Sequence, residues 1–355
     1  MPVHFDSSRM AEVIDNHEKW WCGELNRPLL HGVVSGAYPA PRTASAPLLS
    51  QANCHDFSIS PEEIIDRIDC ELSRNEYLGD GYPMLNMDCF GPGVLAAFCG
   101  AGVDNSSGRI WFFPCEENLS RLHVRYDPEN AWSRRIKAIY RAGLDRWNGS
   151  VIMGLPDLGG VLDVLASLCG TENLLYALID EPEEVQRLIS EIEAAWYAAY
   201  HDFAQTLAPQ GVFTDWNGLL SRKPAYIIQC DFSYMIGPEA FRTFVLDTLL
   251  RDTQRLEHTI YHLDGVGELP HLDMLLALPQ LNAVQWVHGD GKPGPLHWMD
   301  VYRRIANAGK QIMIVGNALE NGFEELTKQL HITPFGSMWL TPGEKDAAIR
   351  LLNCR

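Results

Sequence analysis

The sequence predicts an α/β fold, a (β/α)8 TIM barrel built as a single domain over residues 1–355, with residues 1–80 as an N-terminal helical extension and loop. Short apolar segments alternate with helical patterns along most of the chain, which is typical of a parallel sheet covered by helices. The length of 355 residues fits one barrel, and no G-x-G-x-x-G motif follows the first strand, which disfavours a doubly wound sheet. Polar residues recur where the apolar segments end, and a barrel would gather them at one mouth.

The first 80 residues combine helical and loop patterns with one strand. Ser7 or Ser8 is a suitable cap for the first helix, and Arg27-Pro28 stops it. Proline, alanine and serine are frequent in the loop after the strand. The expected elements are a helix over 7–27, a strand over 29–34, a loop over 36–53 and a helix from 61 to about 74.

Beyond residue 80, short apolar runs predict strands and longer amphipathic patterns predict helices. Strands are expected at 83–88, 110–113, 150–153, 211–214, 226–229, 261–264, 283–287, 311–315 and 337–340. Helices are expected at about 128–147, 160–169, 171–179, 181–207, 238–257, 268–280, 296–308 and 323–330, and from Pro342 onward.

The segment Tyr261-His262-Leu263-Asp264-Gly265 is the centre of the predicted site. His262 and Asp264 are two residues apart, so on a strand both side chains point to the same face. Gly265 ends the strand, which places an imidazole and a carboxylate where a parallel strand becomes a loop, the usual place for chemistry in such folds. The alternative is that the Asp-Gly pair only forms a turn.

The same arrangement recurs at other strand ends, and this recurrence favours an active site over a set of unrelated turns. A barrel brings the carboxyl ends of all its strands together around one mouth. Nine polar residues fall at or just after predicted strand ends: Asp88, Asp157, Asp215, Cys230, Asp231, His262, Asp264, His288 and Glu320.

Composition excludes several classes of protein. The formal net charge is -18 and no basic stripe is present, so a nucleic-acid partner is not expected. No apolar run reaches the ~18 residues that a membrane span needs, and the polar N-terminus is no signal peptide. The nine cysteines are scattered without a C-x-x-C pair, which favours a reducing, cytoplasmic location. The acidic surface is compatible with a homodimer.

The residue types at the strand ends leave two kinds of chemistry open. The chain contains no P-loop, G-x-S-x-G, H-E-x-x-H or kinase motif, so phosphoryl transfer and serine hydrolysis are unsupported. In one hypothesis, carboxylates orient a substrate and an acid moves a proton. In the other, zinc lies among Cys230, His262 and a carboxylate. Cys230 as an inert buried thiol and Asp231 as a turn cap are the structural alternatives.

Five segments of the chain are distinctive in their order and spacing: 86–93 (NMDCFGPG), 180–185 (DEPEEV), 229–241 (QCDFSYMIGPEAF), 261–265 (YHLDG) and 314–317 (IVGN). Together they resemble the uroporphyrinogen decarboxylase superfamily, which also contains zinc- and corrinoid-dependent methyltransferases. The resemblance covers most of the chain from about Pro83 onward. It implies a TIM barrel with its site at the C-terminal mouth.

The decarboxylase branch of that superfamily binds substrate carboxylates with an Arg-rich N-terminal motif. The corresponding stretch here, residues 29–41, contains no arginine, and Arg42 follows it. Asp88 does stand where that branch has its essential aspartate. Without the arginines, a polycarboxylate substrate is hard to hold in an acidic protein.

The methyltransferase branch binds zinc with an H-x-C pair and a later cysteine. Here the pair is His262-x-Asp264, and no cysteine occurs in residues 316–320. The resemblance therefore leaves two possibilities: a metal held by a different set, with Cys230, His262 and Glu320 as the expected ligands, or no metal. A zinc ion would activate a thiol or a methyl-bearing heteroatom.

The resemblance implies a corrinoid-linked methyltransferase that moves a methyl group between a small substrate and a corrinoid carried by a separate protein. Alternatives are a cofactor-free decarboxylase or lyase that uses Asp88 and His262, and a non-catalytic ligand-binding barrel. The expected catalytic residues are Asp88, Asp231, His262 and Asp264. Residues expected to bind substrate are Phe90, Trp216, Tyr234, Trp286 and His288, although the aromatic ones could equally belong to the core.

Overall fold

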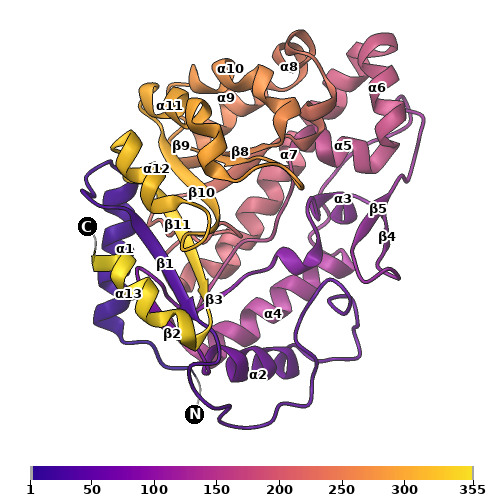
Figure 1. Cartoon of the computed structure of the whole chain (residues 1–355). Coiled ribbons are helices and arrows are strands. Elements are labelled where there is room, and N and C mark those ends of the chain that lie inside the picture. Colours follow the sequence, from indigo (N-terminus) through magenta and orange to yellow (C-terminus); the bar gives the residue numbers. More distant parts are fainter. Residues whose placement is uncertain (1–2, 354–355) are drawn as a thin grey trace.

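The computed structural model describes residues 3–353 and shows an α/β protein with helices packed around a largely parallel sheet (Figure 1). All strand pairs in the sheet are parallel except β1 with β2. The seven strands lie in the order β2 (Glu76–Gly79), β1 (Leu29–Val34), β11 (Phe335–Leu340), β10 (Gln311–Asn317), β9 (Ala283–Val287), β8 (His258–Asp264) and β7 (Ala225–Gln229).

The core of the described residues forms three clusters, and side chains that alternate along the strands of the sheet belong to two of them. Ile227, Ile260 and Ala283 belong to a small cluster on one face, which Trp20 and Trp21 of the first helix close. Their neighbours in sequence, such as Tyr226, Tyr261 and Val284, belong to the large cluster formed with the surrounding helices. The first helix therefore covers this face of the sheet near the starts of the strands. The carboxyl ends of the strands remain uncovered by that helix and are available for the site.

Thirteen α-helices are present among residues 3–353. The predicted helix over 238–257 is divided at Val245. The predicted helix over 268–280 begins in the 3-10 helix η4, which contains Pro270 and ends at His271, and only Leu272–Leu276 of it is α-helical. The helices are α1 Ser7–Trp21, α2 Pro61–Leu72, α3 Leu95–Phe98, α4 Ala131–Trp147, α5 Val161–Cys169, α6 Thr171–Asp180, α7 Pro182–Leu207, α8 Pro238–Phe244, α9 Leu246–Arg255, α10 Leu272–Leu276, α11 Met299–Asn307, α12 Phe323–Leu330 and α13 Lys345–Asn353. The 3-10 helices are η1 Asp88–Phe90, η2 Ala208–Gln210, η3 Asp231–Met235, η4 Val266–His271, η5 Pro295–Trp298 and η6 Pro342–Glu344.

The closed barrel that the sequence predicts is not confirmed. No strand ladder within residues 3–353 joins the two edges of the sheet, β2 and β7. β3 (Met84–Leu85) and β6 (Ile152–Met153) form a separate parallel pair. β5 (Trp111–Phe113) pairs with β4 (Gly102–Asp104) in an antiparallel hairpin, so the strand expected at 110–113 does not belong to the main sheet.

The strand expected at 211–214 is also absent, because isolated backbone and side-chain hydrogen bonds take the place of a continuous ladder there. Only one isolated bridge, between Phe213 and Ser221, forms in this stretch. Leu155 donates its N–H to the carbonyl of Thr214 at 2.8 Å, and Ile227 donates its N–H to Asp215 Oδ2 at 2.8 Å. These bonds connect β6 to β7 without a continuous strand between them.

Two strands from the first 80 residues, β1 and β2, belong to the main sheet. β1 lies between β2 and β11, in full register with β11 from Leu29 to Val34. The helix cap is Asp6, whose side chain accepts the N–H of Arg9, and α1 ends at Trp21, six residues before the predicted stop at position 27. The chain beyond Trp21 leaves the helix because it must turn into β1.

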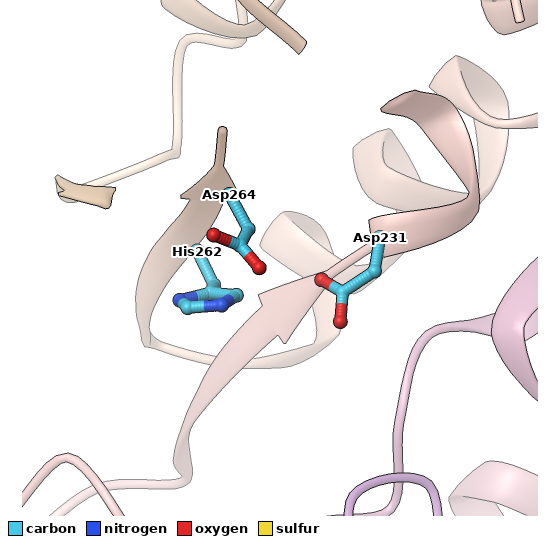
Figure 2. A group of neighbouring side chains, drawn as sticks. All are labelled: Asp231, His262 and Asp264. Carbon is cyan, nitrogen blue, oxygen red and sulfur yellow. The ribbon is translucent and has the colours of Figure 1, made fainter. Parts of the chain in front are cut away.

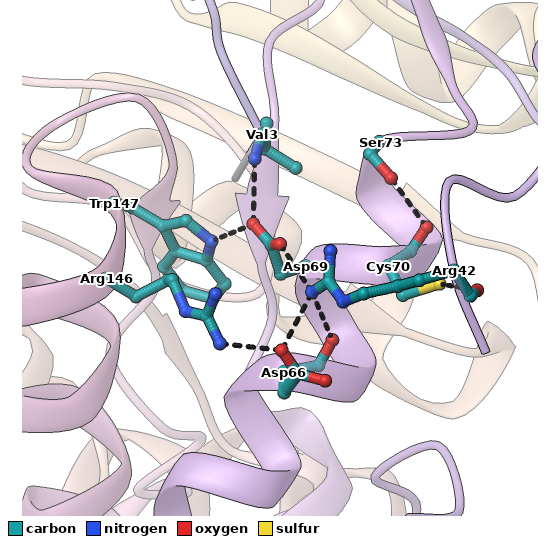
Figure 3. Close-up of polar contacts among 8 residues, drawn as sticks. All are labelled: Val3, Arg42, Asp66, Asp69, Cys70, Ser73, Arg146 and Trp147. Atoms are coloured by element: carbon teal, nitrogen blue, oxygen red, sulfur yellow. Dashed lines mark hydrogen bonds and ion pairs between the residues drawn. The ribbon is translucent and has the colours of Figure 1, made fainter. Parts of the chain in front are cut away.

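A buried carboxylate fixes the N-terminal part of the chain (Figure 3). Asp69 of α2 is 0% exposed and accepts the N–H of Val3 at 2.8 Å and of Trp147 Nε1 at 2.9 Å. Arg42 forms ion pairs with Asp69 and with Asp66, each at 2.8 Å. One aspartate thus connects the N-terminal segment, the 36–53 loop, α2 and α4.

Within residues 3–353, no single helix has the length and apolar character of a membrane span. Only α5 and α6 taken together pass that test of length and composition, and they are bent by 108° at the break between them. The eight cysteines in the described part of the chain are all free.

Candidate active site at the carboxyl ends of β7 and β8

Three potential metal ligands converge where β7 and β8 end (Figure 2). The donor atoms of Asp231, His262 and Asp264 all lie within 4.8 Å of one another, and each of these residues is half-buried. They form the only such group of three or more His, Cys, Asp or Glu residues among those described by the structure. Three of the four expected catalytic residues therefore lie together, and Asp88 is not one of them.

Strand register explains why these three residues meet. Gln229 of β7 pairs with His262 of β8. Asp231 and Asp264 each come two residues later, so Asp264 ends β8 and Asp231 begins η3 just beyond the end of β7. Neighbouring parallel strands lie ~4.8 Å apart, which brings groups at the same level within reach of one ion.

The next strand orients His262. Gln285 of β9 pairs with His262 in register, and its Oε1 hydrogen-bonds to His262 Nδ1. Gln285 donates through Nε2 to the sulfur of Met313 on β10, at 3.2 Å, so its Oε1 faces the histidine. Because a carbonyl oxygen only accepts, Nδ1 carries the proton and Nε2 keeps its lone pair for a ligand.

Trp216 forms a wall beside the histidine. Its ring lies edge-on to the His262 ring, with centroids 5.2 Å apart. The Asp215 carboxylate builds the turn that holds Trp216, because it accepts the Asn217 N–H at 2.9 Å and the Ile227 N–H at 2.8 Å. Asp215 was expected among the polar residues at the mouth of the barrel, but its carboxylate binds backbone N–H groups instead. Burial raises its pKa to about 7.

The electrostatics at this position favour a cation. Burial raises the pKa of Asp231 well above its usual value, and the charges of Asp163 and Asp264 raise it further. One oxygen of Asp231 is enclosed and accepts no hydrogen bond. Burial lowers the pKa of His262, against the opposing effects of Gln285 and Asp264, and this favours the neutral imidazole that a metal needs. A cation here would take the place of the proton on Asp231.

Two further carboxylates surround Asp231. Asp163 of α5 accepts the N–H groups of Asp231 at 3.1 Å and Phe232 at 2.7 Å, which fixes the start of η3. Glu268 of η4 is fully buried, and neither of its oxygens has a hydrogen-bond partner. Burial, followed by the charge of Asp231, raises the pKa of Glu268 to about 10, so this side chain is neutral at pH 7.

The donor set fits a divalent metal ion. Zinc binds histidine nitrogen and carboxylate oxygen at ~2.0–2.2 Å, and catalytic zinc sites keep three protein ligands with one position open. One nitrogen and two oxygens that already lie within 4.8 Å of one another need only small side-chain movements to reach those bond lengths. The enclosed, unpartnered oxygen of Asp231 is the observation on this chain that supports such an ion.

The ligand set expected from the sequence, Cys230, His262 and Glu320, is not the set that the structure brings together. Cys230 is 2% exposed and packs in the core on the helical side, because it alternates with Gln229 and Asp231 along the chain. Burial raises the pKa of its thiol well above the usual value, so it is not a thiolate. Glu320 is exposed after β10, and only His262 belongs to the group of three.

The aromatic residues expected to bind substrate divide into two kinds. Phe90 and Trp286 are buried in the large core cluster, and Trp286 contacts Trp298 on the helical side at 5.4 Å between ring centroids. Trp216 and Tyr234 lie at the site. The Tyr234 ring covers the backbone after Asp264, because a Cβ on Gly267 would come within 2.6 Å of Tyr234 Cγ.

The remaining expected residues lie near the site but outside the group of three. His288, half-buried, is close to the carbonyl of Gly289, with Nδ1 at 3.3 Å. Asp88 is exposed, and its N–H donates to Asn86 Oδ1 at 3.0 Å. Asn86 in turn donates to the carbonyl of Trp216 at 3.3 Å, so Asp88 is connected to the His262 side of the site through these contacts.

Sequence reasoning missed Gln285, Asp163 and Glu268. A glutamine inside the otherwise apolar strand Ala283–Val287 was an available signal for the first. Asp163 had no distinguishing pattern within its helix. Glu268 was expected at the start of a helix, and nothing local in the sequence marks it as buried.

A pocket of about 590 Å³ opens next to Asp231. It lies between the β4–β5 hairpin, α5 and η3. Its walls include Trp111 and Phe112 of the hairpin, Asp163, and Asp231 and Met235 of η3. A small molecule in this pocket would lie against the same carboxylate that belongs to the candidate metal site.

Comparison with known proteins finds a similar fold but no matching sequence family. No protein-family model matches the chain, and no curated protein is significantly similar to it in sequence. The solved structure of a methyltransferase from Methanosarcina mazei is similar, with a TM-score of 0.58 and 11% sequence identity, over 96% of this chain and 98% of that chain. At this identity the likeness establishes a shared fold, and the superfamily resemblance of the sequence is not confirmed.

Proposed function

We propose that this protein is a methyltransferase that moves a methyl group between a small molecule and a corrinoid carried by a separate protein. In this proposal Asp231, His262 and Asp264 hold a divalent metal ion, which we take to be zinc. The observation that carries the proposal is the convergence of these three donors at the carboxyl ends of adjacent strands. The fold shared over nearly the full chain with a protein named as a methyltransferase supports it.

The metal would supply Lewis acidity toward the heteroatom that bears the methyl group. The protein's own residues have separate tasks. His262 offers Nε2 because Gln285 holds the proton on Nδ1. Asp163 fixes the backbone of Asp231 and so its direction. Trp216 shields one side of His262 from water, and exposed Asp88 would contact substrate at the entrance.

The decarboxylase alternative has less support. A polycarboxylate substrate needs several cationic side chains. Arg42, the first arginine after the expected binding stretch, is already paired with Asp66 and Asp69 in the interior of the N-terminal region. Of the residues that line the pocket beside Asp231, Arg109 alone is cationic.

The first test is the metal content of protein purified without chelators. We expect about one zinc or other divalent ion per chain. His262→Ala and Asp264→Asn should lose it. His288→Ala is the matched control, since His288 also follows a strand of the same sheet but lies outside the group of three, and it should keep the ion.

A chain without bound metal, or a His262→Ala variant that retains the metal, would contradict the metal site.

The second test measures methyl transfer. Metal-loaded protein is mixed with candidate methyl donors from a small-molecule screen and a reduced free corrinoid, and methylation of the cobalt is followed in the visible spectrum. Loss of that reaction in Asp264→Asn is the expected result. Metal binding without transfer to any donor would favour the non-catalytic ligand-binding alternative.

A further inference from the structure

The pocket beside Asp231 has walls of two chemical kinds. Most of its lining is apolar and partly aromatic, with Trp111 and Phe112 on the hairpin and Phe232 and Met235 on η3. Trp111 is 59% exposed and Met235 is 48% exposed. Large, solvent-exposed apolar side chains around a pocket with a volume of several hundred Å³ are characteristic of a small-molecule site.

Arg109 supplies the positive charge of this pocket. It lies in the connection between β4 and β5, beside the aromatic residues of the hairpin, and is exposed. Within residues 3–353 its guanidinium forms no ion pair or hydrogen bond, although its backbone N–H bonds to Ser107. An arginine with all its donors free faces a ligand site in a chain whose net charge is -18.

Of the two carboxylates that line the pocket, Asp163 is already engaged by hydrogen bonds. Asp163 accepts three backbone N–H groups, from Gly160, Asp231 and Phe232. Asp231 belongs to the candidate metal site. The cationic group of the pocket is the Arg109 guanidinium, which prefers a planar anion such as a carboxylate.

We infer that this pocket binds a small molecule with an apolar, ring-sized body and one anionic group, and that Arg109 recognises the anion. The identification of this ligand as the methyl donor rests on the proposed function. The inference that the pocket binds such a ligand does not depend on that function. Arg109 would thus determine substrate class, while the apolar walls would hold the body of the ligand with a heteroatom near Asp231.

The test uses three ring compounds of similar shape: 2-naphthoate as the anion, 2-naphthamide as the neutral form and 2-naphthylmethylamine as the cation. Binding to the full-length protein is measured by calorimetry at low salt. We expect naphthoate to bind most tightly. Arg109→Gln should weaken naphthoate about fivefold or more and leave naphthamide unchanged, as expected for one charge-assisted contact at a partly exposed position.

Three further variants separate the effect of Arg109 from those of surface charge, a bound metal and the apolar wall. Arg121→Gln removes another exposed arginine that is not part of the pocket, and naphthoate affinity should not change. His262→Ala should retain naphthoate binding, which separates recognition by Arg109 from coordination of the carboxylate by a metal. Trp111→Ala should weaken the anion and the neutral compound alike, because it removes an apolar wall.

The inference is overturned if Arg109→Gln leaves naphthoate binding unchanged, if the cation binds most tightly, or if none of the three compounds binds. These outcomes are independent of metal content. A metal-free protein that binds naphthoate through Arg109 would contradict the proposed function and leave this pocket assignment intact.

Discussion

His262 and Gln285 are paired in register on β8 and β9, and their side chains hydrogen-bond across the two strands. Gln285 is held in turn by Met313 on β10, to which it pairs in register as well. A single row across three parallel strands thus fixes the tautomer of one histidine. Rows of this kind are rigid, because every member is anchored by the backbone ladder on both sides.

Replacement of Gln285 by leucine should weaken metal binding about tenfold to a hundredfold without removing a ligand, because His262 loses the group that fixes its proton and ring orientation. The measurement is a competition titration with a chromophoric chelator. Gln229→Leu is the matched control, since Gln229 pairs with His262 from the other side and makes no side-chain bond to it. Equal affinities in wild type and Gln285→Leu would show that the histidine needs no such support.

Glu268 should make the protein less stable as pH rises. A glutamate carboxyl has an ordinary pKa of 4.5. In the folded protein, burial and then the charge of Asp231 raise the pKa of Glu268 to about 10. Between these pH values the folded state keeps a proton that the unfolded state has lost, so the free energy of unfolding falls with rising pH. Glu268→Gln cannot titrate, and its stability should decline less from pH 6 to pH 9.

This pH dependence is measured by thermal or urea unfolding of chelator-treated protein at several pH values. The exposed Glu62 offers a control, and Glu62→Gln should follow the wild-type curve. Parallel curves for wild type and Glu268→Gln would contradict the assignment of Glu268 as a neutral, buried acid.

Gly267 should resist substitution because of Tyr234. A Cβ at position 267 would lie 2.6 Å from Tyr234 Cγ, although the tyrosine itself is 50% exposed. Gly267→Ala should therefore cost about 1–3 kcal/mol in the free energy of unfolding. In a Tyr234→Ala background the same change should cost less than half as much, and a double-mutant cycle by urea denaturation measures this coupling. Additive effects would mean that the ring moves aside freely.

Asp69 should be among the most sensitive positions of the N-terminal region. Val3 N–H and Trp147 Nε1–H both donate to Oδ1 of Asp69, and Arg42 donates to Oδ2. Asp69→Asn retains the shape but loses the buried ion pair, and its amide NH2 must face one of these two sets of donors. The expected loss in the free energy of unfolding is about 2–4 kcal/mol. Asp66→Asn, at a partly exposed partner of the same arginine, should cost below ~1 kcal/mol. Similar losses for both variants would exclude a special role for Asp69.

Much of the secondary structure could be predicted from the sequence because its signals are local. β1, β9 and α12 begin and end where the apolar patterns predict. The segment at 110–113 shows the limit of that reasoning. It is a strand, but it forms a hairpin with residues 102–104, and nothing in four apolar residues specifies which partner they pair with.

The candidate site divides in the same way. The proximity of His262 and Asp264 follows from the two-residue period of a strand. The choice between Cys230 and Asp231 could not be made from the sequence, because it depends on how the chain leaves β7 and enters η3. The burial of Glu268 depends on the packing of η3 against η4, which no local pattern records.

The alternation of strands and helices, the acidic character of the chain and the pairing of an imidazole with a carboxylate on one strand all follow from the amino-acid sequence. Each of these is a property of neighbouring residues. The folded chain adds that Asp231 joins that pair, that Gln285 orients the histidine and that Arg109 lines a pocket beside them. Those outcomes depend on the register between strands and on loop placement, since contacts between distant segments are set by the packing of the whole chain.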